Sequence, residues 1–139
     1  MTAHKTPDRN VWFAGSARLV DLQRHVDERG SLLPIEFDRL PFVPRRLFTV
    51  SGMPVGTVRG GHAHRDGHQL LVCLQGRVDI DLRQGGDEAR IALQPDGPGL
   101  LIGPMVWCQQ TYACDGTVLL VTSSEPYDPD SYIEHWNSR

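Results

Sequence analysis

The sequence has 139 residues, of which 40% are hydrophobic and 22% are charged, and its formal net charge at pH 7 is -3. A chain of this length forms one domain with a continuous core. Its charge leaves no basic face of the size that a nucleic-acid-binding protein needs. There is no stretch of 18 apolar residues and no N-terminal apolar run of signal-peptide length, so we expect no membrane partner and no export.

Three cysteines, Cys73, Cys108 and Cys114, occur without CxxC spacing. An odd number of cysteines in this arrangement is typical of a reducing compartment rather than of a disulfide framework. We therefore expect a cytoplasmic protein.

The first sixteen residues are mainly polar and predict an N-terminal arm over 1–16, followed by a single domain over 17–139. Trp12 and Phe13 interrupt this polar segment. Because large aromatic side chains are costly to leave in water, we expect these two to dock on another surface.

From residue 17 onward, short β-type runs alternate with Gly, Pro and Asp, a pattern that predicts an all-β sandwich or barrel. Residues 70–74 and 117–122 are apolar on both faces and are expected in central strands, whereas 77–83 alternates between apolar and polar residues. The ten expected strands are 17–23, 31–37, 45–50, 57–64, 69–74, 77–83, 89–93, 100–102, 106–112 and 118–123.

Turn residues predict how some of these strands are connected. Gly85-Gly86 and Asp115-Gly116 each lie between two β-type runs, so both are expected in tight turns between antiparallel neighbours. At the C-terminus, Asp128 is a candidate N-cap and Pro129 suits the first helical position. Together with the spacing of the apolar residues Tyr132, Ile133 and Trp136, they predict a short C-terminal helix.

The segment GTVRGGHAHRDGHQLLVCLQG, residues 56–76, carries the chemistry. Side chains alternate faces along a strand, so His62 and His64 share one face and Ala63 takes the other. Histidine pairs on strands often have no function. Here Arg59 and two glycines precede the pair, and the spacing over the whole segment agrees with that of the first cupin motif. This context favours a functional site.

This spacing resembles the first cupin motif, which usually binds a divalent metal through two histidines, a glutamate and a later histidine. The present chain has Gln69 in place of the glutamate, and Cys108 where the later histidine is expected. A zinc site of His62, His64 and Cys108 is conceivable. We favour the alternative without metal, in which the two histidines are general acid/base groups.

The chain as a whole resembles the dTDP-4-keto-6-deoxyglucose 3,4-ketoisomerases. The resemblance is carried by DERGSLLPIE, PFVPRRLFTV, RGGHAH, QLLVCLQG, GLLIGPMVW and SSEPYDPDSYI, in this order and without large insertions. It implies a cupin jelly-roll β-barrel that forms a homodimer by exchanging N-terminal strands, which would bury Trp12 and Phe13 against the partner. It also implies a metal-independent, cofactor-independent enzyme whose ligand is a dTDP-linked keto sugar.

The resemblance assigns the catalytic roles to His62 and His64. Arg59 is expected to bind the diphosphate or a sugar oxygen. Further candidates for substrate binding are Arg29, Gln69, Trp107 and Tyr112. Family members tend to carry tyrosine around Phe48 and Thr49 and histidine at Cys108, and for the missing tyrosine hydroxyl Tyr112 is a candidate substitute.

The sequence leaves three other functions open. The chain could be another nucleotide-sugar isomerase or epimerase, with the same histidines delivering a different proton. It could be a non-catalytic sugar-nucleotide-binding cupin, or a metal-dependent cupin oxygenase that uses His62, His64 and Cys108.

Overall fold

A computed structural model describes residues 10–134 and shows a nearly all-β fold. No α-helix occurs in this range, and no described helix is long and apolar enough to cross a membrane. The strands are β1 Val11–Trp12, β2 Ala17–Val20, β3 His25–Asp27, β4 Gly30–Leu32, β5 Arg46–Val50, β6 Thr57–His64, β7 Gln69–Gln75, β8 Val78–Gln84, β9 Asp87–Leu93, β10 Gly99–Ile102, β11 Trp107–Tyr112, β12 Val118–Ser123 and β13 Tyr132–Ile133. Three short 3-10 helices, η1 Phe13–Gly15, η2 Phe37–Arg39 and η3 Pro129–Ser131, complete the described elements.

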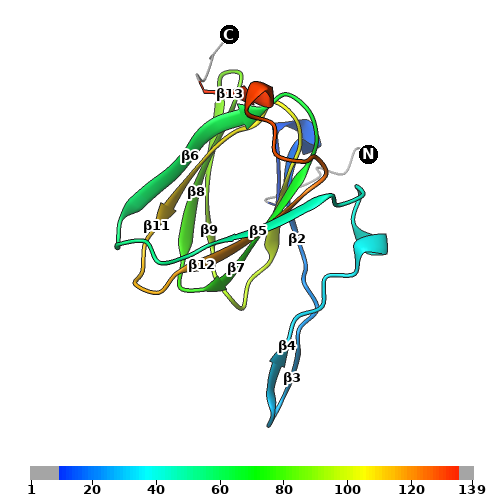
Figure 1. The fold of residues 1–139 in the computed structure, drawn as a ribbon, viewed down its shortest axis with the longest axis vertical. Helices are drawn as coiled ribbons and strands as arrows, with labels where there is room; N and C mark the ends of the chain where they lie inside the picture. Colours follow the sequence, from blue (N-terminus) through cyan, green and yellow to red (C-terminus); the bar gives the residue numbers. More distant parts are fainter. Residues whose placement is uncertain (1–9, 135–139) are drawn as a thin grey trace, which may run out of the picture.

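Two sheets face each other and form the barrel (Figure 1). One has the strand order β1-β2-β10-β7-β12-β5, and the other has the order β13-β6-β11-β8-β9. A separate two-stranded hairpin of β3 and β4 projects away from both (Figure 1). The expected all-β barrel is confirmed.

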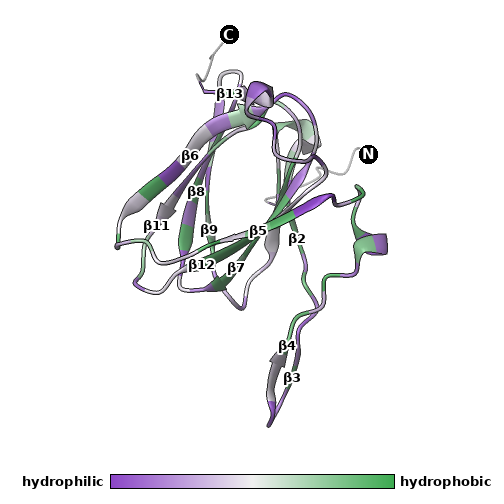
Figure 2. Cartoon of the chain, viewed as in Figure 1, coloured by the Kyte–Doolittle hydropathy of each residue, from purple (hydrophilic) through white to green (hydrophobic). Residues whose placement is uncertain are grey.

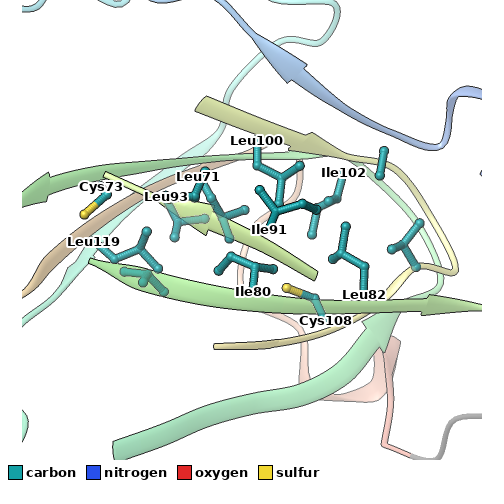
Figure 3. Close-up of a cluster of buried hydrophobic side chains, with 14 of the residues drawn as sticks. Leu71, Cys73, Ile80, Leu82, Ile91, Leu93, Leu100, Ile102, Cys108 and Leu119 are labelled. Atoms are coloured by element: carbon teal, nitrogen blue, oxygen red, sulfur yellow. The ribbon is translucent and has the colours of Figure 1, made fainter. Parts of the chain in front are cut away.

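The core lies between the two sheets, where apolar side chains from both point toward one another (Figure 3). Alternation along β8 supplies Val78, Ile80 and Leu82, each 0% exposed, while Asp79 and Asp81 face outward. Residues 70–74 belong to β7 and residues 118–122 to β12; both strands lie inside the six-stranded sheet and are mostly hydrophobic (Figure 2). The predicted alternation and the predicted central strands are therefore correct.

Of the two predicted hairpins, one is correct and one is wrong. The turn at Gly85-Gly86 joins the antiparallel neighbours β8 and β9. Asp115-Gly116 also lies in a turn, but this turn leads from β11 in one sheet to β12 in the other. Local turn residues define a reversal of the chain, whereas the pairing of β11 with β6 and β8 is decided by contacts distant in sequence.

The predicted C-terminal helix is also wrong for the described residues. Asp128 does cap a helical turn, since its side chain accepts a hydrogen bond from the Asp130 backbone nitrogen at 3.0 Å, but η3 ends after Ser131. Tyr132 and Ile133 then pair with His64 and Ala63 as β13. Pairing to a free strand edge overrides the local helical pattern, and Trp136 lies outside the described residues.

The N-terminal region divides into a docked part and a projecting part. Trp12 and Phe13 do dock, but they pack half-buried against the chain's own core cluster, with β1 paired to β2, rather than on the partner surface that the resemblance implies. The projecting segment, residues 21–45, includes β3 and β4, and only the first two residues of the expected strand 31–37 are in β4. It carries large exposed apolar side chains, among them Val26 at 74% and Leu32 at 64%.

Candidate active site

A cavity of about 500 Å³ opens between the two sheets and contains both motif histidines. Its walls come from β5, β6, β7, β11 and β12 and from the C-terminal segment. The lining residues are Arg46, Phe48, Thr49, Val50, Ser51, Arg59, Gly60, His62, His64, Gln69, Leu71, Gln110, Tyr112, Leu119, Val121, Tyr127 and Tyr132.

A β-bulge in β6 sets which side chains enter this cavity. Cys108 pairs with His62 and Gln109 with Gly60, which leaves Gly61 as an extra residue without a partner in β11. Gly60 and Gly61 both have positive φ, at 81° and 84°, a backbone conformation that suits glycine. Arg59 and His62 are three residues apart and would face opposite sides of a regular strand, but the extra residue turns both inward.

His62 and His64 lie against a third ring. Their ring centroids are 5.3 Å apart with the planes at 80°. Tyr132 stacks on His62 at 4.3 Å and 13°, and meets the His64 ring at 4.7 Å and 75°. The predicted shared face of the two histidines is therefore present, and it forms a compact three-ring cluster.

Both imidazoles are held in the neutral form. Burial lowers the pKa of His62, and the charge of Glu134 opposes this shift. Burial also lowers the pKa of His64 to about 4, and His62 and Arg46 contribute in the same direction. At neutral pH each ring can accept a proton.

Gln69 contacts a catalytic candidate directly. Its Nε2 lies 3.2 Å from Nε2 of His64. An amide nitrogen only donates hydrogen bonds, so this ring nitrogen accepts, and the proton of neutral His64 lies on Nδ1. Gln69 therefore sets the tautomer of His64 and occupies its basic nitrogen.

Arg59 and Tyr112 are also brought to the cavity. Tyr112 is 1% exposed, and its hydroxyl has no hydrogen-bond partner among the described residues. Burial raises the pKa of Tyr112 to about 12, against a smaller opposite effect of Arg59. The Tyr112 hydroxyl thus stays protonated and is free to bind a polar group that enters the cavity.

Sequence reasoning missed the cation on the opposite wall. Arg46 lies 4.5 Å from the Phe48 ring and 5.0 Å from the Tyr127 ring, measured from its guanidinium carbon. Alternation along β5 turns Arg46, Phe48 and Val50 inward, and this pattern is visible in RLFTV once the strand is assumed.

Cys108 lies in the hydrophobic core and not among the cavity residues. Burial raises the pKa of its thiol to about 12, and Gln110 donates a hydrogen bond to its sulfur at 3.3 Å. A thiol in these surroundings is a poor metal ligand because metal binding requires the thiolate. Within residues 10–134, no group of three or more His, Cys, Asp or Glu side chains is arranged to hold a metal ion.

Two predicted substrate-binding residues lie elsewhere in the chain. Arg29 is in the turn between β3 and β4, where it is exposed and paired with Asp27 at 2.7 Å. Trp107 is on the outer face of the five-stranded sheet, with the Arg83 guanidinium 4.7 Å from its ring and its indole nitrogen donating to the Glu134 carbonyl at 3.4 Å.

Comparison with known proteins agrees with the resemblance seen in the sequence. A family model described as "FdtA: WxcM-like, C-terminal" matches residues 15–138. A TDP-4-oxo-6-deoxy-alpha-D-glucose-3,4-oxoisomerase from Aneurinibacillus thermoaerophilus is 31% identical over 122 residues, which are 87% of this chain and 88% of that protein.

Solved structures show the same fold and similar lengths. QdtA, a sugar 3,4-ketoisomerase from Thermoanaerobacterium thermosaccharolyticum solved with TDP, is 36% identical with a TM-score of 0.83, over 87% of this chain and 89% of that one. A QdtA variant has been solved with TDP-4-keto-6-deoxyglucose. The WlaRB TDP-quinovose 3,4-ketoisomerase from Campylobacter jejuni is 32% identical with a TM-score of 0.80, over 86% of this chain and 92% of that one.

Proposed function

Because the chain belongs to the FdtA family of WxcM-like C-terminal domains, we propose that it is a 3,4-ketoisomerase in deoxysugar biosynthesis. Its reaction moves the keto group of a dTDP-4-keto-6-deoxyhexose from C4 to C3. The observation that carries this proposal is the pair of neutral imidazoles, His62 and His64, on the wall of a cavity of about 500 Å³.

The reaction needs two proton transfers at carbon and one net transfer between oxygens. In the proposed mechanism His64 removes the C3 proton of the 4-keto sugar, and the electron pair of the C–H bond forms an enediolate. Protonation at C4 and transfer of the C3 hydroxyl proton to the C4 oxygen then leave the ketone at C3 and a hydroxyl group at C4. His62 serves the oxygens, and each imidazole is suited to its part because it is neutral before the reaction.

Gln69 links substrate binding to this chemistry. In the free protein its amide nitrogen donates to His64 Nε2, the nitrogen that must receive the carbon proton. We propose that a bound sugar oxygen takes over this amide donor and releases the base. Arg59 and Tyr112 line the same cavity, and we expect Arg59 to bind the diphosphate and the unpartnered Tyr112 hydroxyl to bind a sugar oxygen.

The projecting hairpin suggests how the protein assembles. We propose a cytoplasmic homodimer in which this N-terminal hairpin packs on the partner. The contact would bury Val26 and Leu32, the exposed apolar residues of the hairpin. Arg29 would then bind substrate in the partner's cavity, because it is not among the residues that line its own. Light scattering tests the assembly: the wild type should have the mass of a dimer, and Leu32→Asp should shift it toward a monomer.

The catalytic proposal is tested by incubating the protein with dTDP-4-keto-6-deoxyglucose in deuterated buffer and following the sugar protons by NMR. We expect a 3-keto product with solvent deuterium at C4. If the protein binds the nucleotide sugar but neither exchanges a carbon proton nor moves the ketone, the chain is a binding protein or acts on another substrate.

A further inference from the structure

We propose that Tyr132 is a positioning residue, whose single ring fixes the orientation of both His62 and His64 for proton transfer. The observation is the three-ring cluster itself: one tyrosine lies flat on one imidazole at 4.3 Å and edge-on to the other at 4.7 Å. The proposal deepens the proposed function, on which its consequences for turnover rest.

The backbone holds the Tyr132 ring at a fixed place relative to β6. Tyr132 is the strand partner of His64, and the Arg65 backbone nitrogen donates to the Ser131 carbonyl at 2.9 Å. On the far side of this pair, the Met105 backbone nitrogen donates to the His64 carbonyl at 2.8 Å. These backbone bonds attach the segment that carries Tyr132 to the strand that carries both histidines.

His62 Nδ1 is buried and has no hydrogen-bond partner among the described residues, so no hydrogen bond from this atom holds the ring in place. His64 has the bond to Gln69. A flat ring contact restricts an imidazole to a narrow range of side-chain torsions, and it does so without adding a charge to the site. Tyr132 therefore supplies orientation where hydrogen bonding does not.

The same ring contacts both imidazoles and so contributes to their burial. The charged or titratable groups that act on them are Glu134 on His62, and both His62 and Arg46 on His64. Removing the ring would admit water and leave these charges in place. The protonated form of each histidine would become less unfavourable, so both midpoints would rise.

The test is an NMR titration of the histidine C2 protons in the ligand-free protein, which does not depend on any enzymatic activity. Tyr132→Ala should raise the midpoints of His62 and His64 by about 0.5 to 1 pH unit. Tyr132→Phe keeps the ring and should retain the wild-type midpoints. Ile133→Ala is the matched control, because it alters the next residue of β13, outside the cavity, and should leave both midpoints unchanged.

Turnover of dTDP-4-keto-6-deoxyglucose is the second measurement. We expect Tyr132→Ala to lower kcat by about 10- to 100-fold with a smaller effect on KM, and Tyr132→Phe to restore it. If Tyr132→Phe is as defective as Tyr132→Ala, the hydroxyl reacts and the positioning role is wrong. If Tyr132→Ala folds and its histidine midpoints are unchanged, the ring does not control the histidines. If the wild type is inactive but Tyr132→Ala shows the expected midpoint shifts, only the enzymatic proposal is overturned.

Discussion

Strands β8 and β6 flank the same strand, β11, and face the same interior, yet one fills it and the other leaves a cavity. The inward side chains of β8 are aliphatic and 0% exposed. Those of β6 are Arg59, His62 and His64, and they line the open part of the barrel. The barrel is thus divided into a part that provides stability and a part that can provide chemistry, and each can be altered with limited effect on the other.

The largest expected effect is on the β6 side. His64→Ala removes the proposed base and should lower kcat for dTDP-4-keto-6-deoxyglucose by about 100- to 10,000-fold. Because His64 lines a cavity and is outside the core cluster, its loss should leave the fold intact. Turnover and circular dichroism measured on the same sample check both statements, and an unfolded variant or an undiminished kcat would contradict them.

On the β8 side the effect should be reversed. Ile80→Ala creates a hole in a fully buried position and should cost about 2 to 5 kcal/mol of the free energy of unfolding. The folded fraction should keep the wild-type kcat, since Ile80 does not line the cavity. Urea unfolding gives the free energy of unfolding, and kcat per folded active site gives the activity. A stable variant with a strongly reduced kcat would show that the core and the cavity are not separate.

Low pH should reduce the stability of the fold because of His64, which lines the cavity. The pKa of His64 is about 4 in the fold, against an ordinary 6.5, so between these values the unfolded chain binds a proton that the folded chain does not. The free energy of unfolding should therefore fall as pH falls from about 6.5 to about 4, by up to about 3 kcal/mol. Urea unfolding of wild type and His64→Gln isolates this contribution, which must be smaller in the variant.

The smallest expected effect comes from restoring the acidic residue of the usual cupin motif. Gln69→Glu places a carboxylate beside His64 and should raise the pKa of that imidazole by at least about 1 unit. The acid limb of the kcat/KM profile should move to higher pH by the same amount. Gln69→Leu, which adds no charge, is the control, and an equal movement in both variants would refute an electrostatic cause.

The sequence was sufficient for features that depend on one strand at a time. The face shared by His62 and His64 and the alternation of β8 follow from the spacing of residues, and the family follows from the resemblance of its motifs. Features that depend on pairing between distant segments were missed or mispredicted, namely β13, its ring contact with the histidines, and the switch between sheets after Tyr112.

The inward direction of Arg59 shows why one signal went unused. Its odd spacing from His62 contradicts a shared face unless a bulge intervenes, and Gly60-Gly61 within a strand is the usual sign of one. Arg46 required a different kind of information, because only the assembled barrel brings β5 across from β6.

The bulge affects two separate properties of β6, namely which side chains face inward and how strongly the strand bends. Deleting Gly61 would leave Arg59 and His62 two residues apart, so both would still face inward along a straighter strand. Replacing Gly60 by alanine keeps the length but adds a Cβ 2.8 Å from Gln110 Oε1 and 3.0 Å from the Cys108 carbonyl, at a φ of 81°. In this strand a one-residue deletion therefore keeps the inward side chains in register, whereas one added methyl group meets backbone and side-chain atoms at close range.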